Sequence, residues 1–176
     1  VITIAMTAIG HTAHPILRSG ARVGDDIFIS SLPGWSAAGL ELLTKEISLN
    51  SSIADKALSE FSAPSLDYEV NFLQATSMAD ISDSLLIQVQ QVAEASGVCF
   101  DLDTELISQC AEFQELSALA QEVNSDIWSW VLAGGEDHVF LATGKDLPGI
   151  RIGTVVEGSG IRGVEIKKAP VSWSHF

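Results

Sequence analysis

The sequence has few basic residues and no long apolar run. Nine residues are Lys or Arg against 23 that are Asp or Glu, which gives a formal net charge of −14. Because such an acidic surface repels nucleic-acid phosphates and anionic lipid, we expect no nucleic-acid and no membrane partner. No stretch approaches the roughly 18 consecutive apolar residues that a membrane-spanning helix needs.

Cysteines and known catalytic motifs are also scarce. Cys99 and Cys110 match neither metal-ligand nor CxxC spacing. Two plain thiols are typical of a reducing compartment, which favours a cytoplasmic protein. The sequence has no GxxxxGK[ST] loop, no GxGxxG turn and no nucleophile motif, so neither common phosphate-binding loop is available and no catalytic side chain is expected.

Apolar residues, by contrast, are abundant. They make up 47 % of the 176 residues, enough for one domain, 1–176, with a sizeable core. This share predicts either a well-filled core or an apolar face that a partner covers. The first residues resemble a strand without a preceding Met or polar lead, so we expect the sequence to be cut from a longer chain.

The apolar spacing predicts strands and helices without strict alternation, which favours an α+β fold, a mixed β-sheet with packed helices. Alternating apolar residues predict strands over 2–6, 27–31, 98–102, 138–142, 150–156 and 163–168. Helical spacing predicts helices over 34–45, 53–61, 66–76 and 83–96, and two more around 113–119 and 127–131.

The segment Asp80-Ile81-Ser82-Asp83 is the strongest candidate for chemistry. It is expected at the N-terminus of the helix 83–96, where two carboxylates, a hydroxyl and free backbone N–H groups can hold metal and phosphate together. Ser and Asp are also the favoured helix-capping residues. The spacing alone allows both interpretations.

Three further features could contact a ligand. Gly134-Gly135-Glu136-Asp137 predicts either a turn that approaches a ligand closely or an ordinary helix end with solvated acids. Arg18 and Arg22, in a Gly-rich loop, could clamp phosphate or simply lie on the surface. Trp173 could stack on a flat ring or only pack the tail.

Five motifs together resemble those of the thiamine-monophosphate kinases, in the same order and with comparable spacing. They are Arg18-Ser-Gly-Ala-Arg22-Val-Gly-Asp25-Asp26, Gly34-Trp-Ser-Ala-Ala-Gly39-Leu40, Asp80-Ile-Ser-Asp83, Gly134-Gly-Glu-Asp137 and Trp173-Ser-His-Phe176. The resemblance runs from about Ile2 to Phe176. It covers only the C-terminal domain of that family, which belongs with the aminoimidazole-ribonucleotide synthetase-like proteins, and implies that an N-terminal ATP- and magnesium-binding domain is absent.

The resemblance also implies a role for individual residues. It implies that Asp80 and Asp83 are Mg²⁺ ligands and that Arg18 and Ser82 contact ATP. It also implies that Glu136 and Trp173 contact thiamine phosphate. Two neighbouring positions depart from the family pattern. Ser84 stands where the family has Gly, and His138 stands where it has Tyr.

The implied reaction of the full-length protein, a homodimer, is ATP-dependent phosphorylation of thiamine monophosphate to thiamine diphosphate with Mg²⁺ as cofactor. The acceptor is already an anionic phosphate, so no general base is required. The isolated chain, without its N-terminal domain, is expected to be inactive. Two alternatives remain open: a non-catalytic ligand- or partner-binding fragment, and a relative in the same superfamily that acts on another small acceptor.

Overall fold

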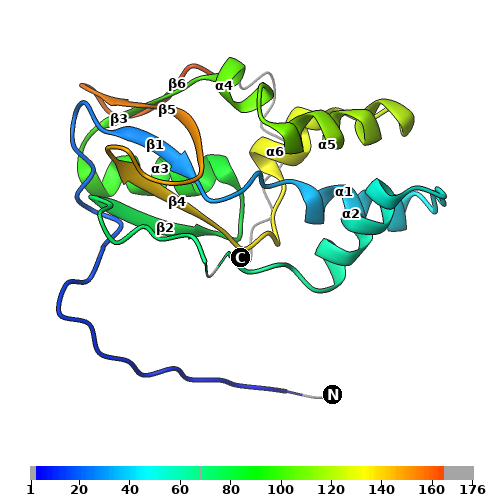
Figure 1. Cartoon of the computed structure of the whole chain (residues 1–176), viewed down its shortest axis with the longest axis horizontal. Coiled ribbons are helices and arrows are strands. Elements are labelled where there is room, and N and C mark those ends of the chain that lie inside the picture. Colours follow the sequence, from blue (N-terminus) through cyan, green and yellow to red (C-terminus); the bar gives the residue numbers. More distant parts are fainter. Residues whose placement is uncertain (1–2, 68, 165–176) are drawn as a thin grey trace.

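A six-stranded mixed sheet forms the centre of the molecule, as seen in the computed structural model, which describes residues 3–67 and 69–164 (Figure 1). The sheet order is β2-β4-β1-β5-β3-β6, and every neighbouring pair is antiparallel except β3 and β6. The strands are β1 (Asp26–Ile29), β2 (Ser77–Ile81), β3 (Cys99–Leu102), β4 (Val139–Gly144), β5 (Ile150–Val156) and β6 (Gly160–Arg162). The mixed sheet with packed helices confirms the α+β expectation.

The helices form two groups. Helix α3 packs against the sheet, whereas α1, α2, α5 and α6 gather beyond one end of it (Figure 1). Their bounds are α1 (Trp35–Thr44), α2 (Ser52–Ser62), α3 (Leu85–Ser96), α4 (Thr104–Ser108), α5 (Ala111–Glu122) and α6 (Ile127–Ala133). Within the part of the chain that the structure describes, no helix is long and apolar enough to cross a bilayer.

Helices α1 and α2 pack closely because Gly39 has no side chain. A Cβ at Gly39 would lie 2.1 Å from the carbonyl oxygen of Ala57, far inside van der Waals contact. The buried face of α1 includes Trp35, Ala38 and Leu42, the face that helical spacing predicted.

The predicted strand over 2–6 is wrong for the described residues. From residue 3 to residue 15 the chain is exposed and has no regular secondary structure, and in Figure 1 this dark-blue segment leads away from the body. Ile4 is 81 % exposed and Met6 is 93 % exposed. Alternation alone produced the prediction, and a strand needs a neighbouring strand to pair with.

The predicted helix over 66–76 is also wrong, since the described residues there form turns. Phe72 is buried in a small cluster with Phe28 and Leu147, whereas Leu73 is 77 % exposed. The short helix α4 was not predicted from sequence. Strand β6 ends at Arg162, before the last predicted strand, 163–168, would begin, and the described residues 163 and 164 form a bend. Residues 165–176 lie outside the described residues.

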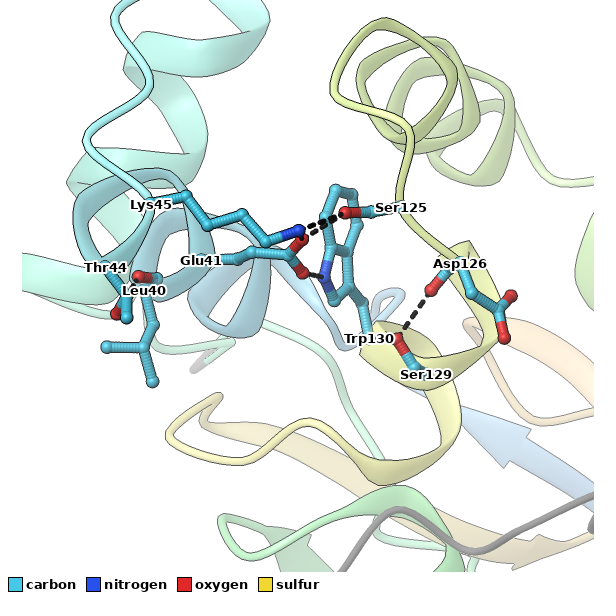
Figure 2. A network of polar contacts seen from close by, with 8 residues as sticks. All are labelled: Leu40, Glu41, Thr44, Lys45, Ser125, Asp126, Ser129 and Trp130. Atoms are coloured by element: carbon cyan, nitrogen blue, oxygen red, sulfur yellow. Dashed lines mark hydrogen bonds and ion pairs between the residues drawn. The ribbon is translucent and has the colours of Figure 1, made fainter.

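A polar network joins α1 to α6. Glu41 accepts hydrogen bonds from the indole of Trp130 at 2.5 Å, from Lys45 and from Ser125 (Figure 2). Partial burial opposes ionisation of Glu41, but these hydrogen bonds outweigh burial and lower its pKa.

Glu41→Gln should therefore destabilise the fold by about 1–2 kcal/mol at pH 7. Because the pKa of Glu41 is lower in the folded state, its contribution is complete above the unfolded value of 4.5 and is lost as the pH falls through the folded pKa. Urea unfolding should show a difference in the free energy of unfolding between wild type and variant that is large at pH 7 and small in acid. The matched control is the exposed Glu122→Gln at the end of α5, for which no comparable difference is expected; an equal difference at both pH values would contradict the assignment.

Candidate functional site

The Asp80–Asp83 segment spans the end of β2 and the turn into α3. Asp80 lies in the strand itself, with its side chain exposed between the buried Ala79 and Ile81. The strand therefore points Asp80 away from the core. The expectation that Asp80 stands at the helix N-terminus is corrected: it precedes the helix by a turn.

The N-cap of α3 is Ser84. Its hydroxyl accepts a hydrogen bond from the N–H of Ile87 at 3.2 Å, and Ser84 is 1 % exposed. Asp80 is thus no cap, and Ser84, the departure from the family pattern, has a structural function. The capping interpretation of Asp80 no longer competes with a ligand-binding one.

Arg18 lies beside Asp80. The distance between Arg18 Nη2 and Asp80 Oδ1 is 4.0 Å, and Arg18 Nη1 donates to Gln91 Oε1 at 3.3 Å. The loop is anchored to α3 by the hydroxyl of Ser96, which accepts from the N–H groups of Gly20 and Ala21 at 3.2 Å each. Both members of the ion pair are more than half exposed, so the pair contributes little to stability and can rearrange around a ligand.

The Gly-Gly-Glu-Asp turn contacts the Asp80–Asp83 segment directly. The N–H of Glu136 donates to the carbonyl of Ser82 at 2.6 Å. A Cβ at Gly135 would lie 2.7 Å from the carbonyl oxygen of Asp83, so only glycine fits there. Two motifs far apart in the sequence are thus joined backbone to backbone, and Glu136 itself is exposed.

Asp137 is buried and ties this turn to helix α1. Its carboxylate accepts from the N–H of Gly34 at 2.7 Å and from the N–H of Ser36 at 3.1 Å. Helix α1 has no side-chain cap at its own N-cap residue Gly34, so Asp137 supplies that cap from another part of the chain. Burial raises the pKa of Asp137 to about 6, although the hydrogen bonds from Gly34 and Ser36 favour its ionised form.

Sequence reasoning named Asp137 and Ser84 but did not identify either as a helix cap. One signal was present for Asp137: helix α1 begins after Pro33-Gly34, without a Ser, Thr, Asp or Asn at its N-cap. Such a buried helix start needs an acceptor from elsewhere.

A hollow of about 200 Å³ lies beside the same turn. Trp35, Glu60, Asp137 and His138 are among its lining residues, and the Lys56 ammonium lies 3.7 Å from the centre of a Trp35 ring. Pockets for drug-sized ligands usually measure about 300–1,000 Å³. The hollow is therefore smaller than a site that encloses such a ligand.

The structure brings together five of the six residues singled out from the sequence. Asp80, Ser82 and Asp83 share one segment, Arg18 lies beside its start, and Glu136 is hydrogen-bonded to its middle. Trp173, the sixth, lies outside the described residues.

The described residues contain no group of three His, Cys, Asp or Glu side chains that could hold a metal ion. Asp80 and Asp83 offer two carboxylates. This donor set fits Mg²⁺, which usually takes one or two carboxylates and completes its shell with phosphate oxygens and water. Arg18 is the adjacent cation, so these side chains are the described groups that metal and phosphate could contact.

The known proteins to which this chain is similar in sequence carry the same name. No family model matches the chain. It is 35 % identical over 160 residues to a thiamine-monophosphate kinase of Mycobacterium tuberculosis, covering 88 % of this chain and 47 % of the relative. It is 31 % identical over 185 residues to that of Aquifex aeolicus, covering 99 % of this chain and 59 % of the relative. The chain therefore spans about half the length of the curated relatives it matches.

Solved structures match the chain in the same way as the sequence relatives do. The structure described as AaThiL complexed with AMPPCP and TMP matches with a TM-score of 0.77 at 29 % identity, over 92 % of this chain and 54 % of that one. The Escherichia coli hydrogenase maturation protein HypE matches with a TM-score of 0.57 at 14 % identity, over 86 % of this chain and 49 % of that one, which supports the fold alone. The fold is that of the aminoimidazole-ribonucleotide synthetase-like C-terminal domains.

Proposed function

We propose that this chain, which is related to the thiamine-monophosphate kinases over most of its length, is the C-terminal half of an ATP-dependent kinase that phosphorylates thiamine monophosphate to thiamine diphosphate. The observation that carries the proposal is the contact between the Gly-Gly-Glu-Asp turn and the Asp80–Asp83 segment through Glu136 N and Ser82 O. This contact places Glu136, the candidate contact of the thiamine phosphate, beside Ser82 and Asp83, the candidate contacts of ATP and Mg²⁺.

Each residue has a role in the proposed site. Asp80 and Asp83 would hold Mg²⁺, which neutralises polyphosphate charge when bound. Arg18 and the Ser82 hydroxyl bind and orient the phosphates of ATP. Glu136 and Trp173 orient the thiamine moiety, whose cationic thiazolium and aminopyrimidine suit a carboxylate and an indole face.

The proposed reaction needs no proton transfer from a side chain. An anionic oxygen of the acceptor phosphate forms a bond to the γ-phosphorus while the bond to the bridging oxygen of ADP breaks. Catalysis then consists of holding two polyanions in line and neutralising their charge. The side chains gathered here, two carboxylates and one guanidinium, suit that task.

We propose further that an N-terminal domain completes the site and that the full-length protein is a cytoplasmic homodimer. The small hollow beside the Gly-Gly-Glu-Asp turn supports a second contributor to the site. The exposed apolar side chains of Ile4, Met6 and Ile9 suit a surface that another domain covers. The free thiols of Cys99 and Cys110 suit the reducing cytoplasm.

The decisive experiment uses the full-length protein with ATP, Mg²⁺ and thiamine monophosphate, and follows thiamine diphosphate by chromatography. Glu136→Gln and Trp173→Ala should each raise the KM for thiamine monophosphate about tenfold and change the KM for ATP far less, since both residues face the acceptor. Glu46→Gln is the matched control, because Glu46 is also an exposed glutamate with a positive φ, 53° against 67° for Glu136. Equal effects on both KM values would count against a thiamine pocket.

A further inference from the structure

We infer that Asp137 is a positioning residue that holds Glu136 in the orientation needed to contact the acceptor. The inference rests on the proposed function, because it concerns how the acceptor side of that site is built. It starts from the backbone of Glu136, which is tied at both of its polar groups. The N–H donates to Ser82 O at 2.6 Å, and the carbonyl accepts from the Ser36 hydroxyl at 3.0 Å, which shares its one proton with the carbonyl of Glu60 at 3.1 Å.

Asp137 controls the second of these bonds. Its two carboxylate oxygens accept from the N–H groups of Gly34 and Ser36, so they fix the start of α1 against the turn. The Ser36 hydroxyl is thereby set within reach of Glu136 O. Asp137 is 5 % exposed and Ser36 is 1 % exposed, so water cannot readily substitute for either.

Glu136 needs this support because of its backbone conformation. Its φ is 67°, in the left-handed region, which is unfavourable for a residue other than glycine. Such a conformation persists only where surrounding contacts over-determine it. The bonds to Ser82 and Ser36 are those contacts, and the carboxylate of Asp137 keeps Ser36 in place.

Only a carboxylate can make the bridge. Two backbone N–H donors face Asp137, and they require two acceptor oxygens. An amide of the same shape offers one acceptor, and its NH₂ group would oppose the other donor. Asp137→Asn therefore breaks the bridge with little change in volume.

In the full-length protein, Asp137→Asn should raise the KM for thiamine monophosphate about five- to tenfold and leave the KM for ATP within about twofold. The double variant Glu136→Gln/Asp137→Asn should have an acceptor KM no higher than Glu136→Gln alone, because Asp137 acts through Glu136. The matched control is Glu112→Gln. Glu112 also accepts a backbone N–H between β1 and α1, from Leu32 at 2.6 Å, so this variant should change the melting temperature but neither KM.

Additive effects in the double variant, or equal increases in both KM values, would overturn the inference. If Asp137→Asn does not fold, Ser36→Ala removes the Glu136 carbonyl bond and should show the same selectivity at about threefold. Hydrogen exchange separates this inference from the proposed function. The Glu136 amide should exchange faster in Asp137→Asn or Ser36→Ala but not in Glu112→Gln, whatever the full-length protein phosphorylates; unchanged exchange in both would also overturn it.

Discussion

Asp80→Asn or Asp83→Asn in the full-length protein is expected to lower kcat by on the order of 10²-fold or more, with the fold intact. Each substitution removes a negative charge from the pair proposed to hold Mg²⁺ against the phosphates. The structure sharpens this expectation, because Asp80 lies in β2 and the α3 cap is Ser84. Measuring kcat together with the melting temperature separates lost chemistry from lost stability.

Asp103→Asn is the matched control for this substitution. Asp103 caps α4 through Oδ1, which accepts from the N–H groups of Glu105 and Leu106 at 2.9 and 3.2 Å. Asparagine caps nearly as well as aspartate, so kcat and melting temperature should both stay near wild type. Normal kcat in both Asp80→Asn and Asp83→Asn would return the segment to a structural role.

The isolated 176-residue chain is expected to form no thiamine diphosphate above background. Its described residues hold two of the oxygen ligands of a proposed metal site, and the hollow beside the turn measures about 200 Å³. The relatives it matches are about twice as long. We therefore expect residues outside these 176 to complete the proposed nucleotide pocket.

The assay mixes the chain with ATP, Mg²⁺ and thiamine monophosphate, beside the full-length protein at equal concentration. A cooperative thermal transition and a far-UV spectrum with both helix and strand would show that the chain is folded during the assay. Robust turnover by the folded chain would contradict the half-enzyme proposal. Turnover by neither protein would instead contradict the proposed reaction.

Local sequence patterns predicted most elements of this fold. Helices α1, α2, α3, α5 and α6 and strands β1, β3, β4 and β5 lie close to where periodicity placed them, and Gly97, with φ 67°, is the C-cap of α3. Strand β2 and helix α4 were not predicted, whereas the two false elements have a common cause. The segments 2–6 and 66–76 carry apolar spacing typical of a strand and a helix, but residues 3–15 have no strand beside them and Phe72 packs in a separate cluster.

The sequence by itself determined the α+β class, the motifs, and the resemblance to the thiamine-monophosphate kinases that the comparisons confirm. Composition, short-range periodicity and motif order are all local or linear properties. Only the tertiary structure decided that Arg18 meets Asp80 and that Glu136 meets Ser82. It alone gave the α1 cap to Asp137, which reaches Gly34 across 103 positions. Such contacts join groups that are far apart in the sequence, and no local pattern records which donor will face which acceptor.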